Sequence, residues 1–302
     1  TDSVRGRAKG SYPDDGGAEF TDDAGRGLVS FNANGFTVGN PQNASSHNNN
    51  GETIVAWCWK AGGAAVSNSD GSVTTSVSVN EEAGFSIVSY SGTGSAGTIG
   101  HGLGKVPKCI ITKRRTGTED WKVYHVHSDG GKFLKLNSTQ AQTSNSDVYP
   151  NTAPTSSVYS LGNHASVNGS GDTYIAYCWA EIPGYSKFGV YTGNGNANGP
   201  FVNIGFRPAL IIIKRIDGAE NWWLYDTKRD PDNPMTQILY GDISNAEINA
   251  TGDDVSNDFV SNGIKFRTAN GNWNGNGMTY VYMAYAEQPG GVTPFRTSPN
   301  AR

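Results

Sequence analysis

The chain has 302 residues, of which 40 are Gly, and only 17% are charged. With 23 Lys and Arg against 27 Asp and Glu, its formal net charge is −4 at pH 7, so no basic surface can neutralise a phosphate backbone and we expect no nucleic-acid partner. No apolar run approaches the roughly 20 residues that cross a bilayer, so we expect no membrane insertion. Seven Trp, 14 Tyr and 11 Phe supply the large apolar areas of an ordered core.

Short strand-like segments dominate residues 83–184. They are rich in Val, Ile, Tyr and Trp and are bounded by clusters of Gly, Asn and Ser, as strands are. Nowhere does a stretch of ten or more residues keep apolar positions at helical spacing without a Gly, Pro or Asn cluster, so helices should span a turn or two at most. The predicted fold class is therefore all-β, with tandem β-sandwich-like modules and very little helix. The clearest strands are expected at Phe85–Tyr90, Cys109–Lys113, Trp121–Val126 and Thr173–Ala180.

The residues after 185 repeat this pattern. Gly104–Arg114 recurs as Gly205–Arg215, and in both copies a Pro follows the Gly by three residues and a Lys-Arg pair ends the strand. Trp121 and Trp222 are separated by the same number of residues as Gly104 and Gly205, so the two copies align without a gap. Internal repeats of this kind indicate that one structural unit is used several times. A second motif occurs three times, at Thr53–Ala61, Thr173–Glu181 and Thr279–Glu287.

The repeats divide the chain into three parts. Residues 1–82 hold a partial first β module plus a linker, residues 83–184 form the second β module, and residues 185–302 form the third with a C-terminal tail. The stretch Ala61–Asn80 is rich in Gly, Ala, Ser and Thr, which is typical of a linker or an extended arm. The first part matches only the closing part of the third module, so we expect its opening strands to come from a longer chain or from a neighbour.

Two kinds of recurring residue suggest structure rather than chemistry. Cys58 and Cys178 align with Ala284, as small buried residues do and as nucleophiles or metal ligands do not, so both thiols are expected in the core. Lys113 and Lys214 stand near the end of the most apolar strand of their modules. We expect these two cations to be solvated.

Candidate catalytic or metal-binding residues are few. His125 and His127 share one face of a predicted strand, a geometry that can hold a transition metal. The third module has Asp226 and Lys228 at these positions, so two exposed strand histidines are the simpler interpretation. Adjacent acidic residues lie in polar loops, where they are usually solvated. We therefore predict no catalytic residue, no cofactor and no metal site.

The motifs of the third module occur in a distinctive order. They are Tyr-Thr-Gly-Asn-Gly at 191–195, Gly205–Arg215, Asn-Trp-Trp-Leu-Tyr-Asp at 221–226, Phe-Val-Ser-Asn-Gly-Ile at 259–264 and Thr279–Glu287. This succession resembles a C-terminal repeat domain of tail-fibre-like proteins of tailed bacteriophages, particularly marine ones. The resemblance implies a non-enzymatic, homotrimeric structural protein of the virion tail, a distal tail-fibre or receptor-binding component that is extracellular. Its partners would be copies of itself, other virion tail proteins and a host surface receptor, either glycan or protein.

Aromatic residues in polar loops that the copies do not share are the candidates for surface binding. Tyr149 and Trp273 stand in such loops, and aromatic rings stack on sugars while nearby hydroxyls and amides bind them. The alternative interpretation of each is a packed loop anchor. Three other functions stay open, namely a glycan-degrading hydrolase of the tailspike type, a capsid-decorating protein and a secreted lectin-like adhesin. The hydrolase would need carboxylates clustered in a groove of one module.

Overall fold

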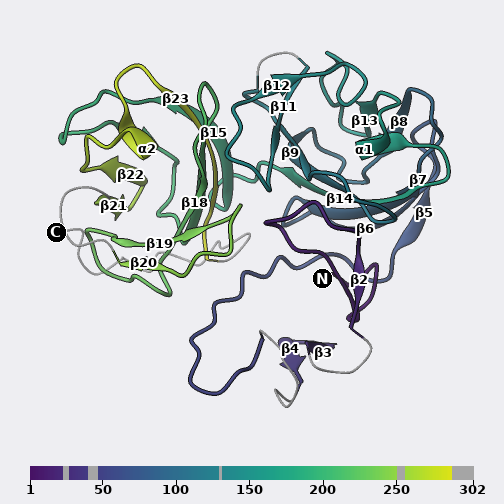
Figure 1. The fold of residues 1–302 in the computed structure, drawn as a ribbon, viewed down its shortest axis with the longest axis horizontal. Coiled ribbons are helices and arrows are strands. Elements are labelled where there is room, and N and C mark those ends of the chain that lie inside the picture. The colour runs from purple at the N-terminus through teal and green to yellow at the C-terminus, as the bar shows by residue number, and fades with distance from the viewer. Residues whose placement is uncertain (23–26, 40–46, 129–130, 250–255, 288–302) are drawn as a thin grey trace.

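The computed structural model describes residues 1–22, 27–39, 47–128, 131–249 and 256–287. The structure is 41% strand and 3% helix, which confirms the predicted all-β class. Figure 1 shows two large β units beside each other, with the N-terminal residues below the second module. Each of the two helices in the described ranges has four residues, and no described helix is long and apolar enough to cross a membrane.

The second module is built on an eight-stranded sheet. In spatial order its strands are β12 (Thr143–Ser144), β11 (Lys132–Lys135), β10 (Lys122–His125), β9 (Pro107–Arg114), β14 (Thr173–Ala180), β7 (Phe85–Ser91), β6 (Thr75–Asn80) and β5 (Val66–Asn68). The central strand β14 pairs antiparallel with β7 on one side and β9 on the other. Successive side chains of β14 enter two different cores, with Ile175 in one and Cys178 in the other, because strand side chains alternate between faces.

A smaller sheet and one helical turn cover one face of this large sheet. β8 (Gly97–Gly100) pairs with β13 (Val158–Leu161), and the turn α1 (Ala165–Asn168) follows in the chain. The buried amide of Asn168 donates to the carbonyl of Gly162 at 2.9 Å, which ties the turn to the loop before it. An apolar core fills the space between the two layers, so the module is a β-sandwich.

The third module repeats this architecture. Its six-stranded sheet runs β15 (Ser186–Thr192), β23 (Thr279–Tyr285), β17 (Leu210–Arg215), β18 (Trp222–Asp226), β19 (Gln237–Tyr240) and β20 (Ile248–Asn249). The covering sheet runs β16 (Phe201–Asn203), β22 (Gly263–Phe266) and β21 (Asn257–Val260). At the end of α2 (Gly271–Asn274), the buried Asn274 takes the role of Asn168 and donates to the carbonyl of Thr268 at 2.7 Å. The predicted C-terminal tail, from residue 288, lies outside the described residues.

The first 60 residues hold the closing strands of a module. β1 (Lys9–Gly10) pairs with β2 (Phe20–Thr21) in the register that joins β11 to β12 and β19 to β20. β3 (Leu28–Asn32) pairs with β4 (Gly35–Val38) as β21 pairs with β22, apart from a register irregularity between Leu28 and Ser30. The segment Thr53–Lys60, which aligns with β14 and β23, pairs with no strand in the described ranges. The sequence repeat therefore extends to the hydrogen-bond register of the strands. We call residues 1–60 the first unit.

Two expectations for the N-terminal region are wrong. Cys58 is exposed whereas Cys178 is buried, because the strands that cover Cys178 have no counterpart around Cys58 in the described chain. Ala61–Asn80 is not a linker throughout, since β5 and β6 extend the large sheet of the second module and Val77 packs into its core. The alternation of Ser and Val in residues 75–80 is the sequence signal of this strand. The second module thus begins before residue 83.

The two complete modules share a further hydrophobic cluster. It is formed by the faces of the large sheets that point away from each module's own small sheet, with Trp179 from the second module and Met283 from the third. Cys109 Sγ lies 3.3 Å from Met283 Sδ across this boundary. Trp57 and Trp59 of the first unit pack against the same cluster. Burial of this common apolar surface stabilises the contact between the modules.

Candidate functional site

The described residues contain two polar contacts between one repeat unit and the next, which we call joints. At the first joint, the first unit lies against the second module. Trp121 Nε1 donates to the carbonyl of Tyr12 at 2.8 Å, and the N–H of Glu119 donates to the carbonyl of Gly16 at 2.8 Å. The loop that connects β1 to β2 is therefore held by a ring N–H and a backbone N–H of the following module.

The second joint, between the second and third modules, has the same bonds. Trp222 Nε1 donates to the carbonyl of Lys135 at 2.8 Å, and the N–H of Glu220 donates to the carbonyl of Thr139 at 2.8 Å. Here the end of β11 and the loop that connects it to β12 take the place of the loop connecting β1 to β2. The same two donors and the same two acceptor positions are used at both joints.

The loops also donate to the following module. The N–H of Glu19 donates to the carbonyl of Arg115 at 2.9 Å, and the N–H of Gln142 donates to the carbonyl of Ile216 at 3.0 Å. Each joint therefore has bonds in both directions, as two paired strands have. This exchange fixes the register of one unit on the next.

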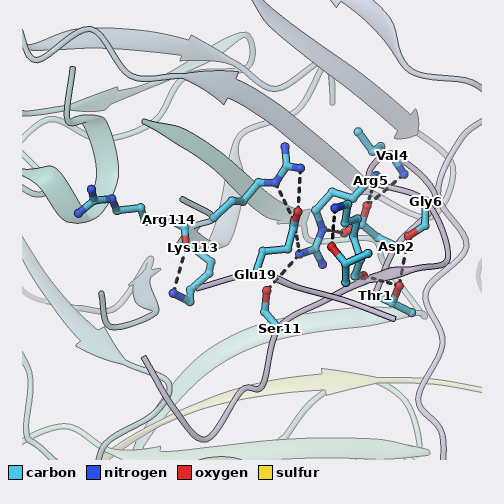
Figure 2. Close-up of polar contacts among 12 residues, drawn as sticks. Thr1, Asp2, Val4, Arg5, Gly6, Ser11, Glu19, Lys113 and Arg114 are labelled. Atoms are coloured by element: carbon cyan, nitrogen blue, oxygen red, sulfur yellow. Dashed lines mark hydrogen bonds and ion pairs between the residues drawn. The ribbon is translucent and has the colours of Figure 1, made fainter. Parts of the chain in front are cut away.

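A fully buried lysine lies at each joint, so the expectation of solvated strand ends is wrong. Lys113 Nζ donates to the carbonyl of Gly16 at 3.1 Å, and Lys214 Nζ donates to the carbonyl of Thr139 at 2.9 Å. Figure 2 shows Lys113 and its neighbour Arg114 beside the residues of the first unit. Burial lowers the pKa of both ammonium groups to about 8. The lysines satisfy backbone carbonyls that the joint removes from water, which is a structural need rather than a surface charge.

An ionic cluster orders the start of the first unit (Figure 2). Arg5 forms ion pairs with Asp2 at 2.5 Å and with Glu19 at 3.1 Å, and it donates to the hydroxyl of Tyr177 on β14 at 2.9 Å. Burial opposes ionisation of Asp2, but the Arg5 guanidinium and further hydrogen bonds hold its pKa below the usual value. The cluster thereby ties the first unit to the sheet of the second module. The same residue types form the ion pairs of the third module, namely Asp226, Arg229 and Glu247.

In the second module, His125 stands at the position that Asp2 has in the first unit and Asp226 has in the third module. It is buried, and its Nδ1 accepts from the N–H of His127 while its Nε2 donates to the carbonyl of Tyr282, both at 3.2 Å. Burial lowers its pKa to about 3, so the ring is neutral at pH 7. Only His127 is exposed, which corrects the expectation of two exposed strand histidines. Within the described ranges, no group of three or more His, Cys, Asp or Glu residues could hold a metal ion.

A partly open pocket of about 250 Å³ lies in the second module. Its lining includes Tyr124, Tyr149 and Tyr159, together with Pro150 and Asn151. Tyr124 is half-buried, and the hydroxyl of Tyr159 makes no hydrogen bond of normal geometry to any described residue. Aromatic rings beside the polar Asn151 suit a small ligand with both apolar faces and polar edges, such as a sugar ring.

The two predicted surface aromatics are both in the module cores. Trp273 is 2% exposed and packs against Tyr225, the fully buried counterpart of Tyr124, so the prediction of a surface contact is wrong for Trp273. The preceding polar residues form the turn α2 and fold this ring inward. Tyr149 is only 4% exposed, so it is no surface aromatic either, but it does line the pocket of the second module.

Removing the buried amine should destabilise both joints. The variants Lys113→Met and Lys214→Met each remove the ammonium donor to the loop carbonyl and to the carbonyl of Glu119 or Glu220, so each should lower the free energy of unfolding by about 2–4 kcal/mol. Urea unfolding followed by tryptophan fluorescence measures this loss. The control Lys60→Met changes an exposed lysine and should cost no more than about 0.5 kcal/mol. A similarly small effect of the two joint variants would show that the amine bonds do not stabilise the joints.

Burial of His125 should make the fold sensitive to acid. The unfolded chain binds the His125 proton near pH 6.5 and the folded chain only near pH 3, so stability falls as the pH is lowered from about 6.5 towards 3. His125→Asn should reduce the stability lost between pH 7 and pH 4.5 by about 2 kcal/mol, measured by urea unfolding at the two pH values. The control His164→Asn, which can still accept the N–H of Ser166, should keep the wild-type difference. An unchanged difference in His125→Asn would contradict the neutral buried ring.

Comparison with known proteins places the chain in a family. No curated protein and no solved structure matches it. The family match covers residues 1–289, which include the first unit, both complete modules and both joints. The chain therefore belongs to the family described as a domain of unknown function, DUF7483.

Proposed function

We propose that this chain is a non-enzymatic structural protein of a phage virion, located in the distal tail fibre, where it contacts glycans or proteins of the host surface. The observation that carries the proposal is the joint that occurs twice with the same donors and acceptors. In each joint, the loop after β1 or β11 binds the following unit at a surface that differs from the loop itself. Such head-to-tail contacts are open-ended, so they suit a protein that extends outward in a row of units.

The motif order of the third module supports the phage assignment. That order resembles a repeat domain of tail-fibre-like phage proteins, and such fibres are homotrimeric, which makes a trimer of this chain the expected assembly. Light scattering should then give a mass near three times the 32.0 kDa of one chain.

The pocket of the second module supports a role in receptor contact. The aromatic ring of Tyr124, which lines this pocket, differs in burial between the two modules. Tyr124 is half-buried, whereas its counterpart Tyr225 is fully buried and packed against Trp273. A repeated scaffold with an aromatic ring that is half-buried in one module and buried in the other is the arrangement expected of a binding site added to a structural repeat. The volume of about 250 Å³ favours a single sugar ring over a large ligand.

The location on the particle tests the structural part of the proposal. Gold-labelled antibodies against the purified chain should bind at the distal end of the tail in electron micrographs of the virions that carry it. Label on the capsid would instead identify a decorating protein. Absence of the chain from purified particles would contradict the virion assignment and favour a secreted adhesin.

The pocket predicts which residue carries glycan binding. On an array of bacterial surface glycans, Tyr124→Ala should lower the affinity for bound glycans about five- to thirtyfold, since a stacked ring contributes about 1–2 kcal/mol. The matched control Phe201→Ala removes an aromatic side chain that is 47% exposed in the third module and should leave binding unchanged. Glycan binding that survives Tyr124→Ala, or release of reducing ends from the array, would contradict a non-enzymatic site at this pocket.

A further inference from the structure

The first unit exposes apolar side chains whose counterparts are buried. Phe31 and Phe36, which face each other across β3 and β4, are 46% and 42% exposed. Their counterparts across β21 and β22, Phe259 and Ile264, are 1% and 0% exposed. The sequence pattern is similar in both places, and Phe31 pairs with Phe36 as Phe259 pairs with Ile264, although β3 also has a register irregularity between Leu28 and Ser30. What differs is the layer that covers these side chains in the third module.

The segment Thr53–Lys60 shows the same difference. Ile54 is 53% exposed, and Cys58 is exposed as well. The residues at the same positions of β14, Tyr174 and Cys178, are both 0% exposed. In the second module β7 and β9 flank β14, and in the third β15 and β17 flank β23. Among the described residues, Thr53–Lys60 has neither neighbour.

The opposite face of this segment is already fixed in place. Trp57 Nε1 donates to Asp226 Oδ2 at 3.2 Å. The ring of Trp59 packs edge-on against Trp179 and Tyr285, with centroid distances of 5.9 and 5.5 Å. The segment is therefore held in place. Among the described residues no strand pairs with either of its edges, although the carbonyl of Lys60, at its end, accepts from Asn80 Nδ2 at 3.2 Å.

We propose that this face binds an opening half of the same repeat. Two antiparallel strands of the β15 and β17 type would pair with the two edges of Thr53–Lys60 and complete a third sandwich. In the third module Asp226, which aligns with Asp2, ends β18 and follows Tyr225 directly in the chain, so an opening half that ends at the position of Tyr225 has the right connection to Asp2. The two complete modules thus show both what covers the face and how it connects. This inference does not depend on the proposed function.

The reactivity of Cys58 tests the proposal. In the parent chain Cys58 is exposed while Cys109 and Cys178 are buried, and burial raises the pKa of both buried thiols. We would fuse a copy of residues 185–225, which contains no cysteine, to the chain so that Tyr225 is followed by Asp2. The reaction of the folded proteins with a water-soluble aromatic disulfide reagent is then followed by absorbance.

The parent should have one rapidly reacting thiol and the fusion none, with the Cys58 rate lowered at least about a hundredfold, because a buried thiol reacts only after local opening. A control fusion, whose added copy carries Ile211→Pro and Ile213→Pro, cannot form the pairing strand and should react like the parent. Reaction of Cys58 at the parent rate in the unmodified fusion would overturn the proposal.

A substitution on the exposed face provides a second readout. Ile54→Asp should leave the urea midpoint of the parent unchanged, because the side chain is in water, but it should restore rapid Cys58 reaction in the fusion, where it would bury an unpaired carboxylate. Equal effects on both proteins would overturn the proposal. Light scattering of the parent tests whether a second copy of the chain occupies the face instead. A dimer in which Cys58 is protected would assign the face to that second copy and overturn the proposal.

Discussion

Burial of backbone carbonyls at the joints is the constraint on which the structure depends. A loop that packs against the next module loses water from its carbonyl groups, and unpaired buried carbonyls are costly. At each joint a Trp ring N–H donates to one carbonyl, and a backbone N–H and the ammonium group of Lys113 or Lys214 donate together to another. The buried ammonium is in turn stabilised by the carbonyls around it. The loop, the lysine and the tryptophan therefore depend on one another, and together they fix the position of one unit on the next.

The joint leaves the rest of each unit free to differ. The position that is Asp2 in the first unit and Asp226 in the third is His125 in the second, and each of the three accepts a backbone N–H two residues later. Their second partners differ, since His125 donates to a carbonyl of the third module whereas the carboxylates pair with arginines. One local turn is thus kept while its outer contacts change. The pocket beside Tyr124 is a larger example of the same freedom.

The strands and the repeat could be predicted from the sequence, because both follow from local patterns. β14 has the bounds expected for it, and the register of β1 with β2 follows from the alignment of the first unit with the third. The burial of individual residues could not be predicted in the same way, since it depends on what packs against them. Cys58 and Cys178 have the same local sequence, yet only Cys178 has a covering layer. Lys113 looks like a solvated strand end until the loop with Gly16 is placed over it.

Hydrogen exchange of the joint amides tests most directly whether one contact is used twice. The N–H groups of Glu119 and Glu220 lie in loops, but each donates to a carbonyl of the preceding unit. We predict that both exchange as slowly as amides in the adjacent strands and within about tenfold of each other, since both should open only when a joint opens. Exchange of either amide at the rate of an exposed loop would contradict the account of a repeated joint.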